Sequence, residues 1–370
     1  MVGIQLFFGL ILFILIFQGA IYGILPFVSP PYLQFGIRIQ DFSGMAGPLS
    51  RVRVLYLIFS ASASAIVIIV FIFLWLLFRT HFLILFIPLL MVIQLTVYLA
   101  SRKRVRLLKL SNPLPEATGG RTEAVFHRSS VRNDFLWMMI PWIELTAFIM
   151  AGFLYYPHIP SLLPTHYGLG GRPDQYSRKS FYSVFLLPVF VGIPITVFFT
   201  FMSRAIRGAR PPYNPSTPRK TAVQITGFNR IISRFISVVN VILIIVFLLI
   251  SLAEWGIISM AVIPYISFLP VSVIISATIF ISLREGQGGW KMYRGLSERP
   301  TSGSVSYVDD DSKWLGGLIY HNRDDPSIMV PRRFGVGYSF NYSNHKSLII
   351  LILILSLPLT TVAMLALRFF

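Results

Sequence analysis

Apolar runs long enough to cross a lipid bilayer recur along this chain of 370 residues, and no other feature restricts its fold as strongly. A membrane-spanning helix needs about 20 mostly apolar residues. Because only helices and closed barrels satisfy their backbone hydrogen bonds in lipid, the pattern predicts an all-α, polytopic helical bundle of about eight transmembrane helices. The eight runs are Ile4–Val28, Val54–Phe78, Phe82–Ala100, Phe135–Tyr156, Phe181–Met202, Phe235–Trp255, Ala261–Leu283 and Leu348–Leu367.

The composition is also typical of an integral membrane protein. Hydrophobic residues make up 55% of the chain and charged residues only 12%, with a mean hydropathy of +0.72. The net charge of +18 is typical of basic loops that lie on one side of a membrane and contact anionic lipid head groups, which we favour over nucleic-acid binding. The absence of cysteine excludes disulfides and thiolate metal sites.

The basic residues also predict an orientation. If residues 29–53, 101–134, 203–234 and 284–346 all lie in the cytoplasm, that side holds 27 of the 32 Lys and Arg residues. The positive-inside rule then places both termini and the connection around His166 outside. We expect the protein to lie in a bacterial plasma membrane.

The chain is predicted to divide into five regions. These are 1–134, with three spans and a basic loop; 135–202, a helical hairpin with an outer loop; 203–283, a basic loop and two spans; 284–346, a cytoplasmic basic loop; and 347–370, the last span.

Small residues predict close helix contacts in the first region. Gly19 and Gly23 lie four residues apart on one helix face, and residues 60–65 alternate serine with alanine. Such positions let neighbouring helices approach each other, so we expect the second span to lie inside the bundle. Between the first two spans, the alternating segment Phe35–Ile39 fits either a small strand or a re-entrant piece.

Residues 164–179, PTHYGLGGRPDQYSRK, separate the fourth and fifth spans and carry the most unusual composition in the chain. Prolines at 164 and 173 disfavour helix, and three glycines permit left-handed turns, so the segment is predicted to be a shaped loop. Its pattern IP-x-x-x-P-T-H-Y-x-x-G-x-x-x-P-D-x-Y-x-x-K resembles the domain of unknown function 1648 of bacterial SdpI-like membrane proteins, over Phe135 to Met202.

SdpI-like proteins include immunity proteins against secreted toxic peptides, so the resemblance implies an outward loop that recognises a peptide. The positions expected to carry recognition are Pro164, His166, Tyr167, Gly170, Pro173, Asp174 and Tyr176. Interfacial tyrosines are also ordinary in membrane proteins. If the loop is purely structural instead, Asp174 is expected to cap the helix that begins before Phe181.

Two acidic residues lie within apolar spans, Glu144 near the middle of the fourth and Glu254 near the outer end of the sixth. An unpaired carboxylate at mid-membrane costs a few kcal/mol, roughly 3 on insertion scales, so Glu144 should face protein. We favour a structural role for it, and the alternative is a proton or cation relay towards His158, His166 and Asp174. Those three residues match no zinc-site spacing, so no metal site is assigned.

A second motif lies in the last basic loop, where Tyr320 to Tyr342 resembles another uncharacterised domain, the domain of unknown function 5808. We interpret its acidic cluster as Asx turns before a proline rather than as a metal site. The Asp309–Asp311 run is interpreted as a solvated linker. The motif residues singled out are Asn322, Asp324, Asp325, Pro326, Arg332, Arg333, Phe334, Gly335 and Asn341.

No phosphate-binding loop, HExxH motif or nucleophile elbow occurs in the sequence, so we expect no enzymatic activity and no cofactor. The leading hypothesis is a membrane protein that senses or neutralises an extracellular peptide or an envelope stress. Its expected partners are membrane lipids and an extracellular peptide. The alternatives are an ion-coupled secondary transporter that uses Glu144, and a regulatory subunit of a neighbouring membrane transporter.

Overall fold

The computed structural model describes residues 2–39, 44–79, 81–112, 132–167, 173–208, 218–293, 295, 311–335 and 337–352. Within these residues, seven helical stretches are long and apolar enough to cross a membrane, and they coincide with the first seven predicted spans. The eighth predicted span lies mostly outside the described residues. The α-helices are α1 (Val2–Val28), α2 (Ala46–Phe78), α3 (Phe86–Leu110), α4 (Arg132–Tyr155), α5 (Phe181–Phe185), α6 (Gly192–Gly208), α7 (Pro218–Glu254) and α8 (Ile263–Glu285).

Short helical turns and four two-stranded antiparallel hairpins connect these helices. The turns are η1 (His81–Leu85), η2 (Tyr156–His158), η3 (Leu186–Val191), η4 (Met260–Val262), η5 (Gln287–Gly289) and η6 (Asp311–Lys313). The hairpins are β1 (Leu33–Gln34) with β2 (Ile37–Arg38), β3 (Leu162–Tyr167) with β4 (Pro173–Arg178), β5 (Trp314–Leu315) with β6 (Ile319–Tyr320), and β7 (Met329–Pro331) with β8 (Tyr338–Phe340). The segment around Phe35 is thus a small strand pair rather than a re-entrant piece.

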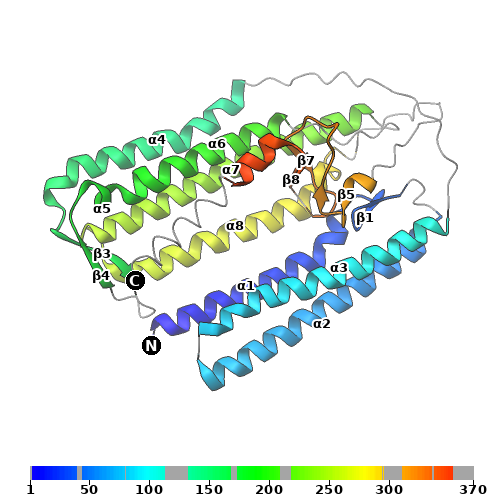
Figure 1. Ribbon diagram of the computed structural model, residues 1–370, viewed down its shortest axis with the longest axis horizontal. Helices are drawn as coiled ribbons and strands as arrows, with labels where there is room; N and C mark the ends of the chain where they lie inside the picture. The colour runs from blue at the N-terminus through cyan, green and yellow to red at the C-terminus, as the bar shows by residue number, and fades with distance from the viewer. Residues whose placement is uncertain are drawn as a thin grey trace.

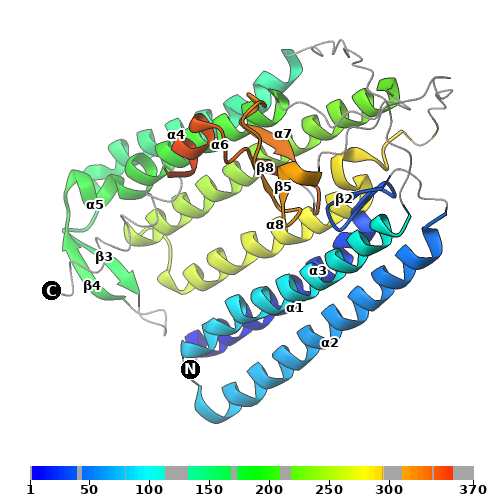
Figure 2. The ribbon, with the colours of Figure 1, turned by 45° about the vertical axis from the view of Figure 1, so that its right-hand side comes forward.

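The helices form two groups joined by α8 (Figure 1). Helices α1, α2 and α3 pack together, α4, α6 and α7 form the second group, and α8 contacts both α1 and α7. The β3–β4 hairpin lies at one end of the bundle, which we call the hairpin end (Figure 2). The hairpins β1–β2, β5–β6 and β7–β8 lie towards the opposite end, which we call the basic end because the basic loops join the helices there.

The first helix group is held by a small polar network and by a close glycine contact. The hydroxyl of Ser60 donates to Gln94 Oε1 at 2.7 Å, and Gln94 Nε2 donates to Ser64 Oγ at 2.8 Å, so α2 and α3 are joined inside the bundle. A Cβ atom at Gly19 would lie 2.6 Å from Ser64 Oγ, so α1 needs glycine there. The predicted close contacts of Gly19 and of the Ser-Ala stretch are both present. The prediction that the second span lies inside the bundle was wrong, because α2 lies at its edge (Figure 1), contacts mainly α1 and α3, and exposes apolar residues such as Ile66 and Phe73.

The helices extend further at the basic end than hydropathy predicted. Helix α2 begins at Ala46, α3 continues to Leu110 and α7 begins at Pro218, so basic residues assigned to loops are helical. Lys and Arg are good helix formers, and their long stems let the charged head reach water or lipid phosphate. Hydropathy therefore located the apolar part of each helix and missed its amphipathic extension.

The fifth span is not one regular α-helix. It consists of α5, a π-helical turn at η3 and then α6. Pro188 lies inside the π-helical turn and is buried there. Because proline lacks an N–H group and clashes with the preceding turn, it prevents a regular α-helix at this point.

We predict that the hairpin end and the basic end lie on opposite sides of the membrane. The natural chain has no cysteine, so a single cysteine at Gln175 in β4 or at Leu315 in β5 gives a clean label. In intact cells, a membrane-impermeant maleimide should label Gln175→Cys, and it should label Leu315→Cys only after permeabilisation. Labelling of both variants in intact cells would reject this topology, and the reverse pattern would invert the orientation.

Candidate functional site

The segment predicted to be a shaped loop is a β-hairpin at the hairpin end. Strands β3 and β4 pair Leu162 with Arg178 and Pro164 with Tyr176, and the register shifts around His166. Proline is tolerated here because a two-stranded hairpin consists only of edge strands, where a missing N–H donor need not break the ladder. The prolines therefore excluded helix, as predicted, but did not exclude strand.

The hairpin is anchored to the bundle on its inner side. Leu163 and Ile159 are buried in a cluster with residues of α4, α5 and α7. The ammonium group of Lys179 donates to the carbonyl oxygen of Ile159 at 2.9 Å and lies 5.2 Å from the centre of the Tyr156 ring. These contacts fix the base of the hairpin against the helices.

Ser180 caps α5 through a capping box with Ser183. Asp174, the cap expected if the loop were structural, therefore does not fill that position. Ser180 stands immediately before the helix, where its side chain reaches the Ser183 backbone N–H at 3.1 Å. Asp174 lies on β4, six residues further from the helix start.

The predicted recognition residues are distributed over both strands. Asp174 and Tyr176 are exposed on β4, and Pro164 is buried on β3. By register, His166 lies opposite Gln175, and Tyr167 lies opposite Pro173. Gly170 lies outside the described residues. Among the described residues, β4 exposes a carboxylate, an amide, a tyrosine ring and a guanidinium, at Asp174, Gln175, Tyr176 and Arg178.

A shallow, open depression of about 420 Å³ lies at the hairpin end, between the ends of α4 and α7. Its walls are mostly apolar, and two rings, those of Tyr155 and His158, lie 5.4 Å apart at its edge. The lining residues are Ala151, Leu154, Tyr155, His158, Leu252, Trp255 and Ile257. The hairpin end thus combines an exposed strand pair with an apolar depression.

The two acidic residues of the spans occupy different depths. Glu144 lies near the middle of α4 and Glu254 is the last residue of α7, and both are half-buried. His158 is 14 residues beyond Glu144, which corresponds to about 20 Å along a helix. A direct relay between Glu144 and His158 is therefore too long for a single hydrogen bond or one bridging water.

The motif at the basic end is folded by side-chain hydrogen bonds to the backbone. Asn322 Oδ1 accepts from the Asp324 N–H at 3.2 Å, and Asp325 Oδ1 accepts from the Ser327 N–H at 2.9 Å. These are the Asx turns that the sequence predicted before Pro326. Within the described residues, no group of three His, Asp or Glu side chains is arranged to hold a metal ion.

Asn341 closes this motif. It is fully buried, and its Nδ2 donates to the carbonyl oxygens of Asn322 and Asp325, each at 2.8 Å. Arg332 Nε donates to the Tyr338 carbonyl at 3.0 Å across the β7–β8 turn, where Gly335 has a left-handed backbone with φ +84°. Burial raises the pKa of Tyr338, so its hydroxyl remains a donor, and it donates to Asn229 Oδ1 on α7.

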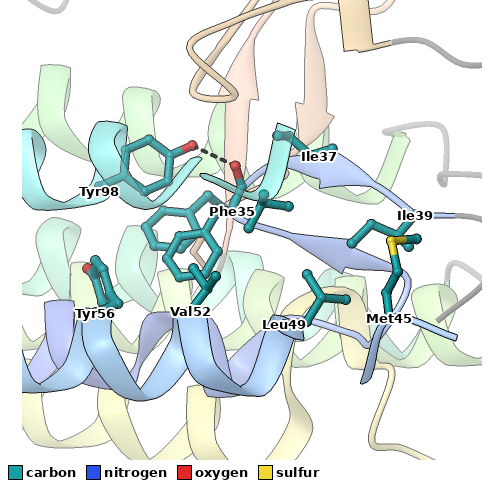
Figure 3. Close-up of a cluster of buried hydrophobic side chains, with 10 residues drawn as sticks. Phe35, Ile37, Ile39, Met45, Leu49, Val52, Tyr56 and Tyr98 are labelled. Carbon is teal, nitrogen blue, oxygen red and sulfur yellow. Dashed lines mark hydrogen bonds between the residues drawn. The ribbon is translucent and has the colours of Figure 1, made fainter. Parts of the chain in front are cut away.

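Phe334 and Arg333 join the motif to the first helix group. The Phe334 ring lies 4.3 Å from the Tyr98 ring and stacks on Phe35 at 5.8 Å. The Tyr98 hydroxyl donates to the Phe35 carbonyl at 3.2 Å, as Figure 3 shows. Arg333 is 4% exposed and contacts Asp311, and its guanidinium lies 5.4 Å from the Trp314 ring.

The interpretation of Asp311 as part of a solvated linker was wrong. Its carboxylate contacts Arg333, accepts from Lys109 Nζ at 2.7 Å and accepts from the Arg38 backbone N–H at 3.2 Å. Three segments that are distant in sequence supply these partners. Asp309 and Asp310 lie outside the described residues.

Other residues of this end were missed because their partners are also distant. Gln287 accepts from the Ser29 hydroxyl at 2.9 Å and contacts the Arg332 carbonyl, and Trp290 Nε1 donates to the Val28 carbonyl at 2.6 Å. The sequence signal that could have drawn attention to them is the Gly-Gln-Gly-Gly-Trp segment directly after an apolar span.

Together these features define a polytopic helical membrane protein with folded hairpins at both ends of the bundle. Two family models match parts of the chain. A domain of unknown function, DUF1648, covers residues 145–192, and a family of unknown function, DUF5808, covers residues 323–342. These are the two domains that the sequence motifs resembled. No curated protein and no solved structure matches the chain.

Proposed function

We propose that this is a non-enzymatic protein of a bacterial plasma membrane that recognises an extracellular peptide through the β3–β4 hairpin. The observation that carries the proposal is the exposed hairpin, with a shallow apolar depression at the same end of the bundle. An extended peptide can add a strand to a free sheet edge while its side chains enter nearby pockets. The proposal also rests on the sequence resemblance to SdpI-like immunity proteins, and the DUF1648 match includes the whole hairpin.

The geometry gives the hairpin an outer edge for such a strand. Strand β4 pairs only with β3 among the described strands, and it carries exposed Asp174 and Tyr176. The Tyr176 side chain is 58% exposed, so its ring is available to pack against a bound peptide. The bundle supports the hairpin from its other side, so binding does not require the hairpin itself to fold first.

The orientation proposed with this function places the hairpin outside the cell. The basic end then faces the cytoplasm, where its Lys and Arg residues contact anionic lipid head groups. Recognition outside could neutralise a peptide directly or pass a signal through the helices to the basic end. A partner membrane protein would be needed only for the second of these outcomes.

We expect Tyr176→Ala and Asp174→Ala each to reduce protection against a toxic peptide about tenfold, because an interfacial tyrosine or charge is commonly worth 1–2 kcal/mol. Cells that carry the variants are challenged with a panel of synthetic membrane-active peptides, and the lethal concentration is compared with that of wild-type cells. Immunoblots of the membrane fraction must show unchanged abundance, since an exposed strand position contributes little to stability.

Tyr265→Ala is the matched control. Tyr265 is 61% exposed near the start of α8, on the same side of the membrane but on another element. Its removal should leave protection within about twofold of wild type. Equal protection by Tyr176→Ala and wild type would refute recognition by the hairpin. If Glu144→Gln abolishes protection while both hairpin variants keep it, ion-coupled transport replaces this proposal.

A further inference from the structure

Three helices of the second group each bury an oxygen atom that has no hydrogen-bond partner in the part of the chain that the structure describes. These atoms are Glu144 Oε2 of α4, Thr196 Oγ1 of α6 and Asn240 Oδ1 of α7. Thr196 is 0% exposed and Asn240 is 1% exposed. Ser251 Oγ, eleven residues after Asn240 on α7, is likewise buried and unsatisfied among the described residues. Buried polar atoms are almost always hydrogen-bonded, so the three oxygens on three different helices require an explanation.

Contacts between α6 and α7 place Thr196 and Asn240 opposite each other. The hydroxyls of Ser203 and Ser233 lie 2.6 Å apart between these antiparallel helices. Thr196 precedes Ser203 by seven residues, and Asn240 follows Ser233 by seven residues. Seven residues are about two helical turns and about 10 Å, so both side chains keep the face and the depth of the serine pair.

Contacts of α4 bring Glu144 to the same depth. Trp142 Nε1 donates to Thr200 Oγ1 at 3.0 Å, and Leu145 contacts α6 at Gly192, so Glu144 is level with Thr196. Towards α7, the guanidinium of Arg234 lies 5.8 Å from the Trp137 ring. Glu144 follows Trp137 by seven residues and Asn240 follows Arg234 by six, so the two are also level in these parallel helices.

At this level, the described parts of α4, α6 and α7 carry no Lys or Arg residue. No Lys or Arg occurs between Phe135 and Tyr155 of α4, between Gly192 and Ser203 of α6, or between Phe235 and Glu254 of α7. A carboxylate at this depth therefore needs a neutralising cation from outside the protein, or a proton. The Thr196 hydroxyl bonds neither Glu144 Oε2 nor Asn240 Oδ1, so these oxygens do not satisfy one another within the described residues.

The backbone next to this level is also irregular. The π-helical turn at η3 ends directly before Gly192, one turn from Thr196. π-Helical turns occur frequently at functional sites, and interrupted membrane helices often border ion sites. This irregularity is a second observation, independent of the three oxygens, in the same part of the bundle.

We propose that Glu144, Thr196 and Asn240 bind a monovalent alkali cation of the Na⁺ type between α4, α6 and α7. A carboxylate, a hydroxyl and an amide oxygen are the hard ligands that such a cation prefers, and the single negative charge matches its charge. This binding site is independent of peptide recognition by the hairpin.

The test is equilibrium binding of ²²Na⁺ to the purified full-length protein, with ionic strength held constant by choline chloride. Wild-type protein should bind Na⁺ saturably, and Glu144→Gln should weaken binding at least about tenfold. The control is Glu254→Gln, which removes the acidic group at the hairpin end and should leave the affinity within about twofold. Absence of saturable binding in wild type, or equal binding by Glu144→Gln, overturns the proposal.

The substitutions Thr196→Val and Asn240→Leu test the site in a second way, through the melting temperature of the protein with and without Na⁺. If these oxygens hold no ligand, replacing them by apolar groups should preserve or raise the melting temperature in both salts. If they hold Na⁺, the variants should lose the increase in melting temperature that Na⁺ gives to wild type over choline. Thr196→Ser retains the hydroxyl and should retain that increase. Stabilisation of wild type by low pH alone, without any Na⁺ effect, would also contradict a cation site.

Discussion

Replacing Asp311 by alanine should destabilise the protein by about 3 kcal/mol and lower its apparent melting temperature by roughly 5–10 °C. The change removes the carboxylate that Arg333 and Lys109 share, and Arg333 is 4% exposed. A buried guanidinium that loses its anionic partner retains its desolvation cost without compensation. Thermal unfolding of the purified protein, followed by tryptophan fluorescence, measures the effect.

Asp324→Ala serves as the control for this prediction. Asp324 belongs to the same motif but is exposed, and we expect its removal to cost at most about 0.5 kcal/mol. The double variant Asp311→Ala with Arg333→Met should be more stable than Asp311→Ala alone, because it also removes the buried guanidinium that has lost its contact with this carboxylate. A melting temperature of Asp311→Ala equal to that of Asp324→Ala would show that this carboxylate does not hold the basic end together.

The role of Asp311 could not be predicted because its partners are remote in sequence. Lys109 and Arg38 precede it by 202 and 273 residues, and the neighbouring Ser-rich sequence is typical of a linker. The Asx turns of the same motif were predictable, since Asn322 and Asp325 bond backbone groups two residues away. Short sequence patterns can therefore predict local hydrogen bonds. The partners of the Asp311 carboxylate, in contrast, depend on how segments distant in sequence pack together.

The same distinction explains the membrane spans and the hairpin. Hydropathy is a property of about 20 consecutive residues, so it located seven spans that the structure contains. The proline and glycine content of residues 164–179 correctly excluded helix in the described parts of that segment, residues 164–167 and 173–179. Strand pairing of Leu162 with Arg178 was not predictable from that content, because proline usually argues against strands and only an edge strand tolerates it.

The oxygens of Thr196 and Asn240 were missed for another reason. Glu144 attracted attention because a charged residue in an apolar span is rare, but threonine and asparagine carry no charge. Asn240 nevertheless lies in a long apolar run, and a buried amide is costly without a partner. Treating every polar side chain in a span as a candidate would have named it, although only the helix contacts place it level with Glu144.

Replacing Gly289 by alanine should destabilise the protein by about 3 kcal/mol. Gly289 has φ +75°, and a Cβ atom there would lie 2.8 Å from both the Gln224 carbonyl oxygen and Phe228 Cβ on α7. The backbone of the η5 turn would have to shift away from α7. That shift would weaken the bonds from Gln224 Nε2 to the Trp290 and Met292 carbonyls, at 3.1 and 2.8 Å.

Gly288→Ala separates backbone strain from this overlap, because Gly288 has φ +64° but no atom within 4 Å of its Cβ position. It should cost only the left-handed strain, about 1 kcal/mol. Thermal unfolding should therefore rank wild type above Gly288→Ala and Gly288→Ala clearly above Gly289→Ala. Equal melting temperatures for the two variants would mean that close packing of this turn on α7 contributes nothing beyond backbone conformation. A lower melting temperature of Gly289→Ala than of Gly288→Ala requires instead that the η5 turn after α8 packs directly against α7. This packing connects the basic end to the helices that carry Glu144, Thr196 and Asn240.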